Sequence, residues 1–258
     1  MTDLLHGAEP VRSEGSGPYG ALCLHGFTGS PHSMRGLAAA MSEAGFAVSA
    51  PLLPGHGTTI EDMMQTGWDD WRGAAESAYA ELAATVGRVV VAGLSMGGTL
   101  TAALAAAHPE IAGIVVINPY IDPPAPAFRE LIRGVLDSGS TAAPAIGSDI
   151  ADTGAHEVGY TGTPLVPLLS LCEGLDDLFP RLGDINCPVL LMTSRDDHVV
   201  PTVSSDLLAE AVTGPVERVW LERSFHVATL DYDRDDIERR TVEFAIKRCR
   251  AGAYDHHR

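Results

Sequence analysis

The sequence predicts an α/β fold in which one domain, over residues 1–258, holds a mostly parallel sheet flanked by helices. Short apolar runs alternate with helical segments along most of the chain. Several of these runs are apolar throughout rather than at every second residue, which is typical of strands covered by helices on both faces. A chain of 258 residues is also long enough to bury a full hydrophobic core.

The individual elements follow from local composition. Runs of apolar and β-branched residues predict strands at 21–24, 46–50, 88–92, 114–117, 189–192 and 216–221. Helices are expected at 34–44, 68–86 and 96–107. The last of these is rich in alanine, which has the highest helix propensity.

Residues 119–184 interrupt this alternation. The segment contains eight prolines and many glycines, with only short helical pieces such as 128–136. A structureless connection of this length is improbable inside a compact domain. We therefore expect an inserted cap over 119–184, above the carboxyl ends of the strands, where open α/β sheets bind their ligands.

The net charge of −17 narrows the range of partners. Nucleic-acid binding depends on Lys and Arg contacts to phosphate, so this charge argues against nucleic acid. An anionic membrane surface would repel the chain as well. No apolar stretch approaches the roughly 20 residues that cross a bilayer, and we expect no stable membrane insertion.

Cysteine usage and the first residues bear on the compartment. Four cysteines, at 23, 172, 187 and 249, show neither metal-ligand spacing nor a dense disulfide pattern. Residues 1–5 lack the basic segment and apolar core of a secretory signal. A reduced, cytoplasmic setting is expected. Nothing in the sequence indicates the oligomeric state.

The segment Gly93-Leu94-Ser95-Met96-Gly97 lies between an expected strand and an expected helix. Strand, Gly-x-Ser-x-Gly turn and helix together form the context of a nucleophile elbow, in which a sharp turn exposes the serine hydroxyl. Small residues on both sides of the turn allow the strand and the helix to pass close together. Ser95 is therefore the candidate nucleophile.

A serine hydroxyl is a weak nucleophile and needs a base that a carboxylate orients. His226 follows the last expected strand, and Asp196 and Asp197 follow the strand at 189–192. Serine, acid and histidine then occur in one of the known triad orders, with both loops at the carboxyl edge of the sheet. His226 is the candidate base. At this point either aspartate fits as the acid.

An oxyanion hole needs two backbone N–H donors directed at the developing charge. One is expected from Met96, the residue after the nucleophile. The second is expected from Phe27, in the glycine-containing loop 24–29 after the first long apolar run.

These segments resemble the α/β-hydrolase superfamily, and more narrowly the bacterial carboxylesterases and monoacylglycerol lipases with a small cap. The resemblance covers most of the chain and rests on residues 25–29, 51–57, 93–98, 197–201 and 226–231. It implies an α/β-hydrolase fold with Asp197 as the acid, because Asp197-His198-Val199-Val200-Pro201 has the Asp-x-x-Val-Pro spacing usual after this strand. Fewer than 25 residues precede His25, which leaves little room for the full opening hairpin, so a sheet of about seven strands is expected.

Within the cap, residues 147–150 and 156–160 are similar to the monoacylglycerol lipases. That resemblance implies that Glu157 holds the glycerol hydroxyls; an exposed surface carboxylate is the alternative. The apolar cap residues are expected to receive the acyl chain, or else only to seal the cap against the body: Leu136, Ile146, Leu165, Val166 and Leu169.

Together these features indicate a serine ester hydrolase that cleaves short- to medium-chain acyl esters through an acyl-enzyme, with monoacylglycerol as the favoured small-molecule substrate. No metal and no organic cofactor is implied. A thioesterase, a peptidase or a cofactor-free haloperoxidase would use the same geometry. A non-catalytic ligand-binding protein on this fold is a further alternative, against which the intact serine, acid and histidine order argues.

Overall fold

The computed structural model describes residues 3–144 and 148–251. A seven-stranded sheet forms its centre, in the order β1-β3-β2-β4-β5-β8-β9. β1 pairs antiparallel with β3, and the remaining neighbours are parallel. The predicted, mostly parallel sheet of about seven strands is thus confirmed. The strands are β1 (Val11–Ser13), β2 (Tyr19–Leu24), β3 (Ala47–Ala50), β4 (Arg88–Leu94), β5 (Gly113–Ile117), β8 (Val189–Ser194) and β9 (Val216–Leu221).

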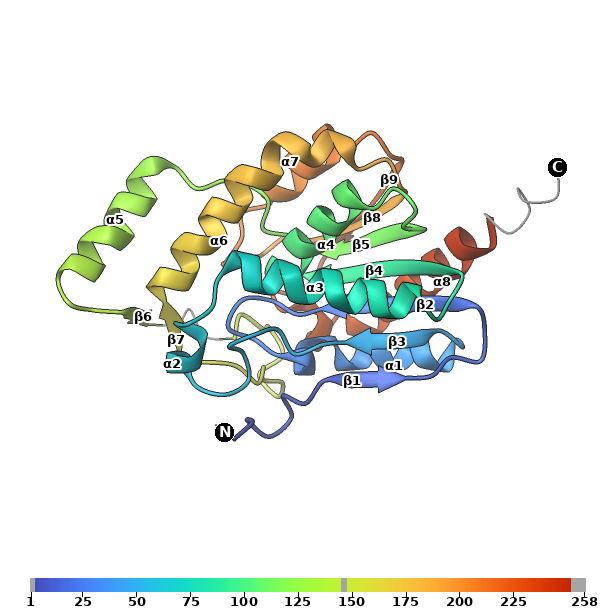
Figure 1. Ribbon diagram of the computed structural model, residues 1–258, viewed down its shortest axis with the longest axis horizontal. Coiled ribbons are helices and arrows are strands. Elements are labelled where there is room, and N and C mark those ends of the chain that lie inside the picture. Colours follow the sequence, from blue (N-terminus) through green and yellow to red (C-terminus); the bar gives the residue numbers. More distant parts are fainter. Residues whose placement is uncertain (1–2, 145–147, 252–258) are drawn as a thin grey trace.

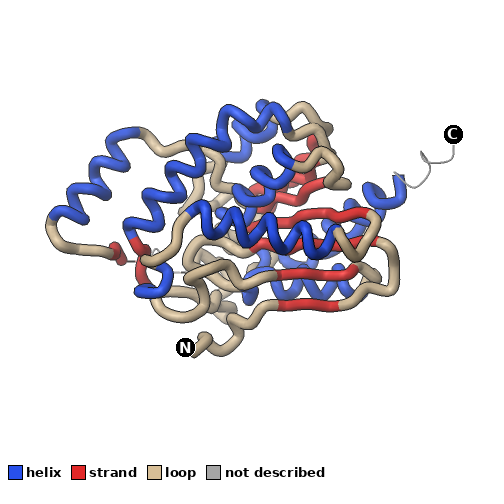
Figure 2. Tube along the Cα trace, in the orientation of Figure 1, coloured by secondary structure: helices blue, strands red, loops and turns tan. Residues whose placement is uncertain are grey.

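Helices cover both faces of this sheet (Figure 2). Adjacent residues of a strand point to opposite faces. In β4, Val89 and Val91 therefore join one hydrophobic cluster while Val90 and Ala92 join another. The first cluster includes residues of α3 (Trp68–Ala83), α4 (Met96–Ala107), α6 (Leu165–Leu178) and α7 (Val203–Ala211). The second includes residues of α1 (Arg35–Glu43) and α8 (Arg234–Ala251). This division explains the continuously apolar strands.

The segment between β5 and β8 extends past one end of the sheet (Figure 1). It contains α5 (Pro126–Asp137), the short antiparallel pair β6 (Ala142–Pro144) and β7 (Gly162–Pro164), α6 and the 3-10 helix η2 (Phe179–Asp184). The short helix α2 (Ile60–Met63) lies near β7 at the same end (Figure 1). The carboxyl ends of β2 and β4 point toward this end.

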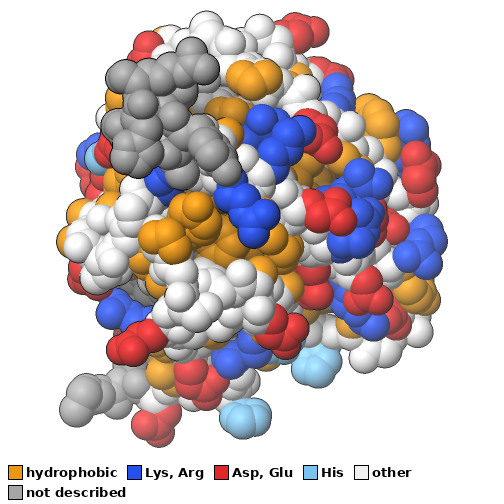
Figure 3. All heavy atoms as spheres, turned by 90° about the vertical axis from the view of Figure 1, so that its right-hand side faces the viewer, with side chains coloured by type: hydrophobic (Ala, Val, Ile, Leu, Met, Phe, Trp, Pro, Cys, Tyr) orange, Lys and Arg blue, Asp and Glu red, His pale blue; other side chains and the backbone are white. Residues whose placement is uncertain are grey.

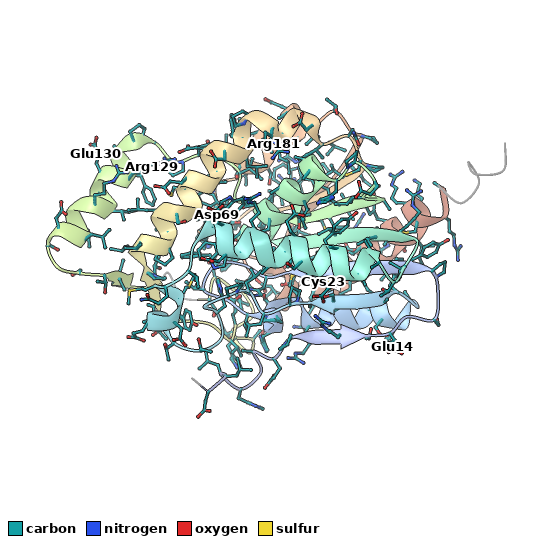
Figure 4. The ribbon with its side chains drawn as sticks, in the orientation of Figure 1. Glu14, Cys23, Asp69, Arg129, Glu130 and Arg181 are labelled. Carbon is teal, nitrogen blue, oxygen red and sulfur yellow. The ribbon has the colours of Figure 1, made fainter. Side chains whose placement is uncertain are left out.

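α5 stands farthest from the sheet and is tied to α6 by an ion pair. Arg129 reaches from α5 toward α6 (Figure 4), and its Nη2 lies 2.7 Å from Oδ1 of Asp176. α6 in turn runs from the outer part of this segment into the body, because Leu171 and Leu178 belong to the first hydrophobic cluster. One helix is therefore shared by the predicted insertion and the core.

Several elements were not identified in the sequence. β1 is a three-residue polar edge strand, and α8 is rich in charged residues. α8 is held by side chains buried at three- or four-residue spacing, namely Ile237, Thr241, Phe244, Ala245 and Cys249. None of the described helices is long and apolar enough to cross a membrane.

The molecular surface at the end opposite α5 carries Asp and Glu side chains beside Lys and Arg side chains, with hydrophobic patches between them (Figure 3). Although acidic residues are in excess in the sequence, this face of the molecule is not a continuous negative surface.

Candidate active site

Ser95 occupies the turn between β4 and α4. Its φ of 57° and ψ of −120° place a non-glycine residue in a region that is sparsely populated and strained. The Ser95 N–H donates to the carbonyl of Ile117 over 3.0 Å, which ties the turn to β5. A Cβ on Gly93 or on Gly97 would lie 2.1 Å from a backbone oxygen, so both positions require glycine. The elbow predicted from Gly-x-Ser-x-Gly is present.

His226 and Asp197 form a buried pair beside the carboxyl edge of the sheet. Nδ1 of His226 lies 2.7 Å from Oδ2 of Asp197, and the two side chains are 8% and 2% exposed. The other carboxylate oxygen, Oδ1, accepts the N–H groups of Val199 (2.9 Å) and Val200 (2.8 Å). Asp196 is exposed. The structure thus brings Asp197 to His226.

Ser95 and His226 line the same cavity, which has a volume of about 540 Å³. Phe27, Met96 and Glu157 line it as well. Asp197 does not contribute to the wall, because it contacts the side of the imidazole that Nδ1 occupies. Ile146 lies outside the described residues.

Both predicted oxyanion donors belong to segments that approach Ser95. Met96 is the first residue of α4, and the first N–H groups of a helix have no acceptor within the helix. The loop that carries Phe27 passes close to the nucleophile, since a Cβ on Gly26 would lie 3.3 Å from Cβ of Ser95.

The side chain of His25 forms hydrogen bonds that hold this loop in place. Burial, together with the neighbouring His56, lowers the pKa of His25 to about 3, so the imidazole is neutral. Its Nε2 accepts the N–H of Leu53 over 3.1 Å, and its Nδ1 lies 2.9 Å from the carbonyl oxygen of Gly26. A neutral ring that donates from Nδ1 and accepts at Nε2 satisfies both contacts. The histidine therefore has a holding role and is not placed to act as a second base.

Glu157 extends into the cavity from the segment between β6 and β7. Burial raises the pKa of its carboxyl to about 7, against the opposing effect of His226. A Cβ on Gly29 would lie 2.5 Å from Oε1 of Glu157, so this glycine leaves room for the carboxyl. The alternative of an exposed surface glutamate does not fit this environment.

The apolar wall of the cavity differs from the expected one. Leu136, Leu165, Val166 and Leu169 do not line the cavity; Tyr120, Phe128, Leu168 and Leu171 do. For Val166 and Leu169 the physical reason is the helical register of α6, because Leu168 and Leu171 are three residues apart and share the side that lines the cavity. Leu165 is the first residue of the helix and is buried, and Leu136 belongs to α5.

Sequence reasoning missed two aspartates that hold the loops around His226. Asp149 accepts N–H groups from His226 and His198, and Asp231 accepts N–H groups from Phe225 and Ala151. Both lie in segments that carry the family resemblance, but contacts between positions about 80 residues apart leave no signal in a single sequence.

Comparison with known proteins gives consistent similarities. The profile of a family described as Hydrolase_4, serine aminopeptidase S33, matches residues 21–233. A thermostable monoacylglycerol lipase of Bacillus sp. (strain H-257) is 44% identical over 250 residues, which cover 95% of this chain and 96% of the relative. A carboxylesterase of Bacillus subtilis (strain 168) is 30% identical over 234 residues, covering 90% and 94%.

Solved structures agree with these relatives. A structure from work on the metagenome-derived lipolytic enzymes LipS and LipT superposes with a TM-score of 0.90 at 38% identity, covering 95% of this chain and 100% of that one. The monoacylglycerol lipase of Paleococcus ferrophilus superposes with a TM-score of 0.73 at 18% identity, over 93% of this chain and 99% of that one. The second likeness bears on the fold alone.

Proposed function

Because this chain belongs to the Hydrolase_4 family of α/β-hydrolases, we propose that it hydrolyses monoacylglycerols through an acyl-enzyme on Ser95. At the coarser level it is a serine ester hydrolase. The observation that carries the proposal is the hydrogen bond between Asp197 and His226, at the edge of the cavity that Ser95 also lines.

In this mechanism His226 donates its Nδ1–H to Asp197, which leaves the Nε2 lone pair free to accept the Ser95 proton. The Ser95 oxygen then attacks the ester carbonyl, and the N–H groups of Phe27 and Met96 stabilise the oxyanion. The protonated His226 gives its proton to the leaving alcohol. Water, deprotonated by the same histidine, hydrolyses the acyl-enzyme and restores the serine.

The polar and apolar parts of the cavity support a monoacylglycerol as substrate. Glu157 offers carboxyl oxygens to the two free hydroxyls of the glycerol, on the same cavity as His226. Tyr120, Phe128 and Leu168 offer an apolar wall to the acyl chain. The name of the 44% identical relative agrees with this substrate.

We also propose that residues 119–184 act as the cap, with α5, β6 and β7 as its outer part. The position of these elements at the carboxyl end of the sheet supports this role (Figure 1). The proposed compartment is the cytoplasm, because all four cysteines are buried free thiols, as expected in a reducing environment.

The test compares monoolein, a short-chain p-nitrophenyl ester, an acyl-CoA and an aminoacyl amide as substrates of the wild-type protein and of Ser95→Ala. We expect hydrolysis of monoolein with a higher kcat/KM than that of the acyl-CoA or the amide, no activity in Ser95→Ala, and covalent labelling of the wild type alone by a fluorophosphonate. Preference for the amide would favour the peptidase activity in the family's description. Equal labelling of Ser95→Ala would overturn the assignment of the nucleophile.

A further inference from the structure

Asp149 is the point at which the segment between β6 and β7 contacts the base. Its Oδ2 accepts the backbone N–H of His226 over 3.0 Å and that of His198 over 3.1 Å. Its Oδ1 lies 2.8 Å from Nδ1 of His198. Its own carbonyl accepts the N–H of Val227 over 3.0 Å. Asp149 thus forms hydrogen bonds with the backbone of His226, the proposed base, and with that of Val227, which follows it. It also contacts His198, the residue after Asp197.

The Asp149 side chain is only 10% exposed, so its contact with the N–H of His226 is largely shielded from water, whereas the His198 side chain is exposed. A carboxylate forms stronger hydrogen bonds with N–H groups than a neutral acceptor does. Removing the carboxylate would leave the N–H groups of His226 and His198 without this acceptor. The loop that carries His226 would then be free to relax away from its present position.

Asp231 makes the reciprocal contacts from the other side. This aspartate is completely buried, and its Oδ2 accepts N–H groups from Phe225 (2.9 Å) and Ala151 (2.7 Å). Its Oδ1 accepts the N–H of Asp152 over 3.0 Å. The segment at 149–152 and the loop at 225–231 therefore each offer a carboxylate to the backbone of the other. Neither can shift without breaking hydrogen bonds in both directions.

We propose that Asp149 is a positioning residue for His226, which couples the placement of the base to the placement of the cap segment. The inference rests on the proposed function of Ser95 and His226. Asp149 contacts the backbone of His226 and not its imidazole, so it acts through the loop and takes no part in proton transfer. Its role is to keep Nε2 within reach of the Ser95 hydroxyl and Nδ1 on Asp197.

The proposal predicts a specific kinetic signature for Asp149→Ala. A displacement of the base by about 1 Å can lower the rate by up to about 100-fold, so we expect kcat to fall by roughly 10- to 100-fold. KM for a short-chain p-nitrophenyl ester should change little, because this substrate makes few contacts with the cap. The rate of fluorophosphonate labelling should fall by the same factor as kcat. Labelling at completion should still reach one equivalent per chain.

Asp149→Asn and Asp152→Ala are the matched variants. The side-chain amide oxygen in Asp149→Asn can still accept both N–H groups, so this variant should recover most of the wild-type kcat. Asp152 lies in the same segment, but its side chain accepts the N–H of Gly154 and contacts Arg234 rather than the base or its loop. Asp152→Ala should therefore keep the wild-type kcat. Should Asp149→Ala fail to fold, Asp149→Ser takes its place in the comparison.

An unchanged kcat in Asp149→Ala would overturn the proposal. So would an equal loss in Asp149→Asn, which would mean that charge and not hydrogen bonding matters, or an equal loss in Asp152→Ala, which would indicate general disturbance of the segment. A change confined to KM would also overturn it. If the fluorophosphonate does not label the wild type, or if Ser95→Ala retains activity, the proposed function itself is wrong. If the wild type is active and Asp149→Ala has the same kcat, the proposed function stands and only the role of Asp149 is wrong.

Discussion

The environment of Glu157 predicts how the stability of this protein depends on pH. Burial raises the pKa of this carboxyl from an ordinary 4.5 to about 7. Between these two values the folded protein binds a proton that the unfolded chain has released. Stability therefore falls as the pH rises through this window, and the loss is complete above the folded-state pKa. Below pH 4.5 both states are protonated and the group contributes no pH dependence.

The magnitude follows from the width of the window. Each pKa unit corresponds to about 1.4 kcal/mol, so the charged carboxylate lowers the free energy of unfolding by about 3 kcal/mol at pH 8 relative to pH 4. Gln has nearly the same shape and no charge at either pH. We expect Glu157→Gln to match the wild type in stability near pH 4 and to exceed it by up to about 3 kcal/mol near pH 8.

The measurement is urea unfolding of both proteins at half-unit intervals between pH 4 and pH 8. The quantity of interest is the difference between the variant and the wild type, because other titrating groups contribute equally to both. Glu130→Gln, on the outer side of α5 (Figure 4), controls for the substitution itself. A difference for Glu157→Gln that stays constant across the range would refute the argument, because it would mean that the carboxyl is not enclosed.

Four further predictions concern the site and the stability of the fold. Asp197→Asn should lower kcat by about 10⁴-fold, whereas Asp196→Asn should stay near the wild type; the reverse order in the ester assay would exclude Asp197 as the acid. Glu157→Ala should raise KM for monoolein by roughly 10-fold or more, because hydrogen bonds to the glycerol hydroxyls are lost. KM for a p-nitrophenyl ester, which has no glycerol, should stay unchanged, and an equal rise there would contradict the prediction. Gly97→Ala places a Cβ 2.1 Å from a β2 carbonyl and should lower the melting temperature. Gly73→Ala, in open space on α3, should raise stability by about 0.5–1 kcal/mol, and a loss there would contradict the helix propensity argument.

The sheet and the sharp turn at Ser95 could be predicted from sequence because their signals are local. Ser95 is the centre of a five-residue Gly-x-Ser-x-Gly motif that joins a strand to a helix, and the continuously apolar strands require cover on both faces. α8 was not predicted because charged residues dominate its composition, although its buried residues recur at the three- to four-residue spacing of an amphipathic helix.

The choice between Asp196 and Asp197 needed more than local pattern. Two adjacent carboxylates are equivalent in composition, and only the turn after β8 decides that Asp197 points inward. Resemblance favoured the same residue, by the spacing to Pro201.

The segment at 119–184, the proposed cap, was the least predictable part for a physical reason. Its segments are short and irregular, so their positions depend on contacts with distant residues rather than on local periodicity. The rotation of α6 decides that Leu168 and not Leu169 faces the cavity. The bonds from Asp149 to the loop of His226 join positions 77 apart in the chain, which no local pattern encodes.

The sharing of α6 between the proposed cap and the core has a consequence for protein engineering. Exchanging caps between related enzymes is a common route to new specificities, and it presumes that the cap is a detachable module. In this protein a replacement that extended to the start of β8 would also remove Leu171 and Leu178 of α6. These two residues belong to the first hydrophobic cluster, so their loss would leave a gap in the core. A chimaera cut within residues 119–164 keeps the core filled, and only the outer part of this cap behaves as an interchangeable unit.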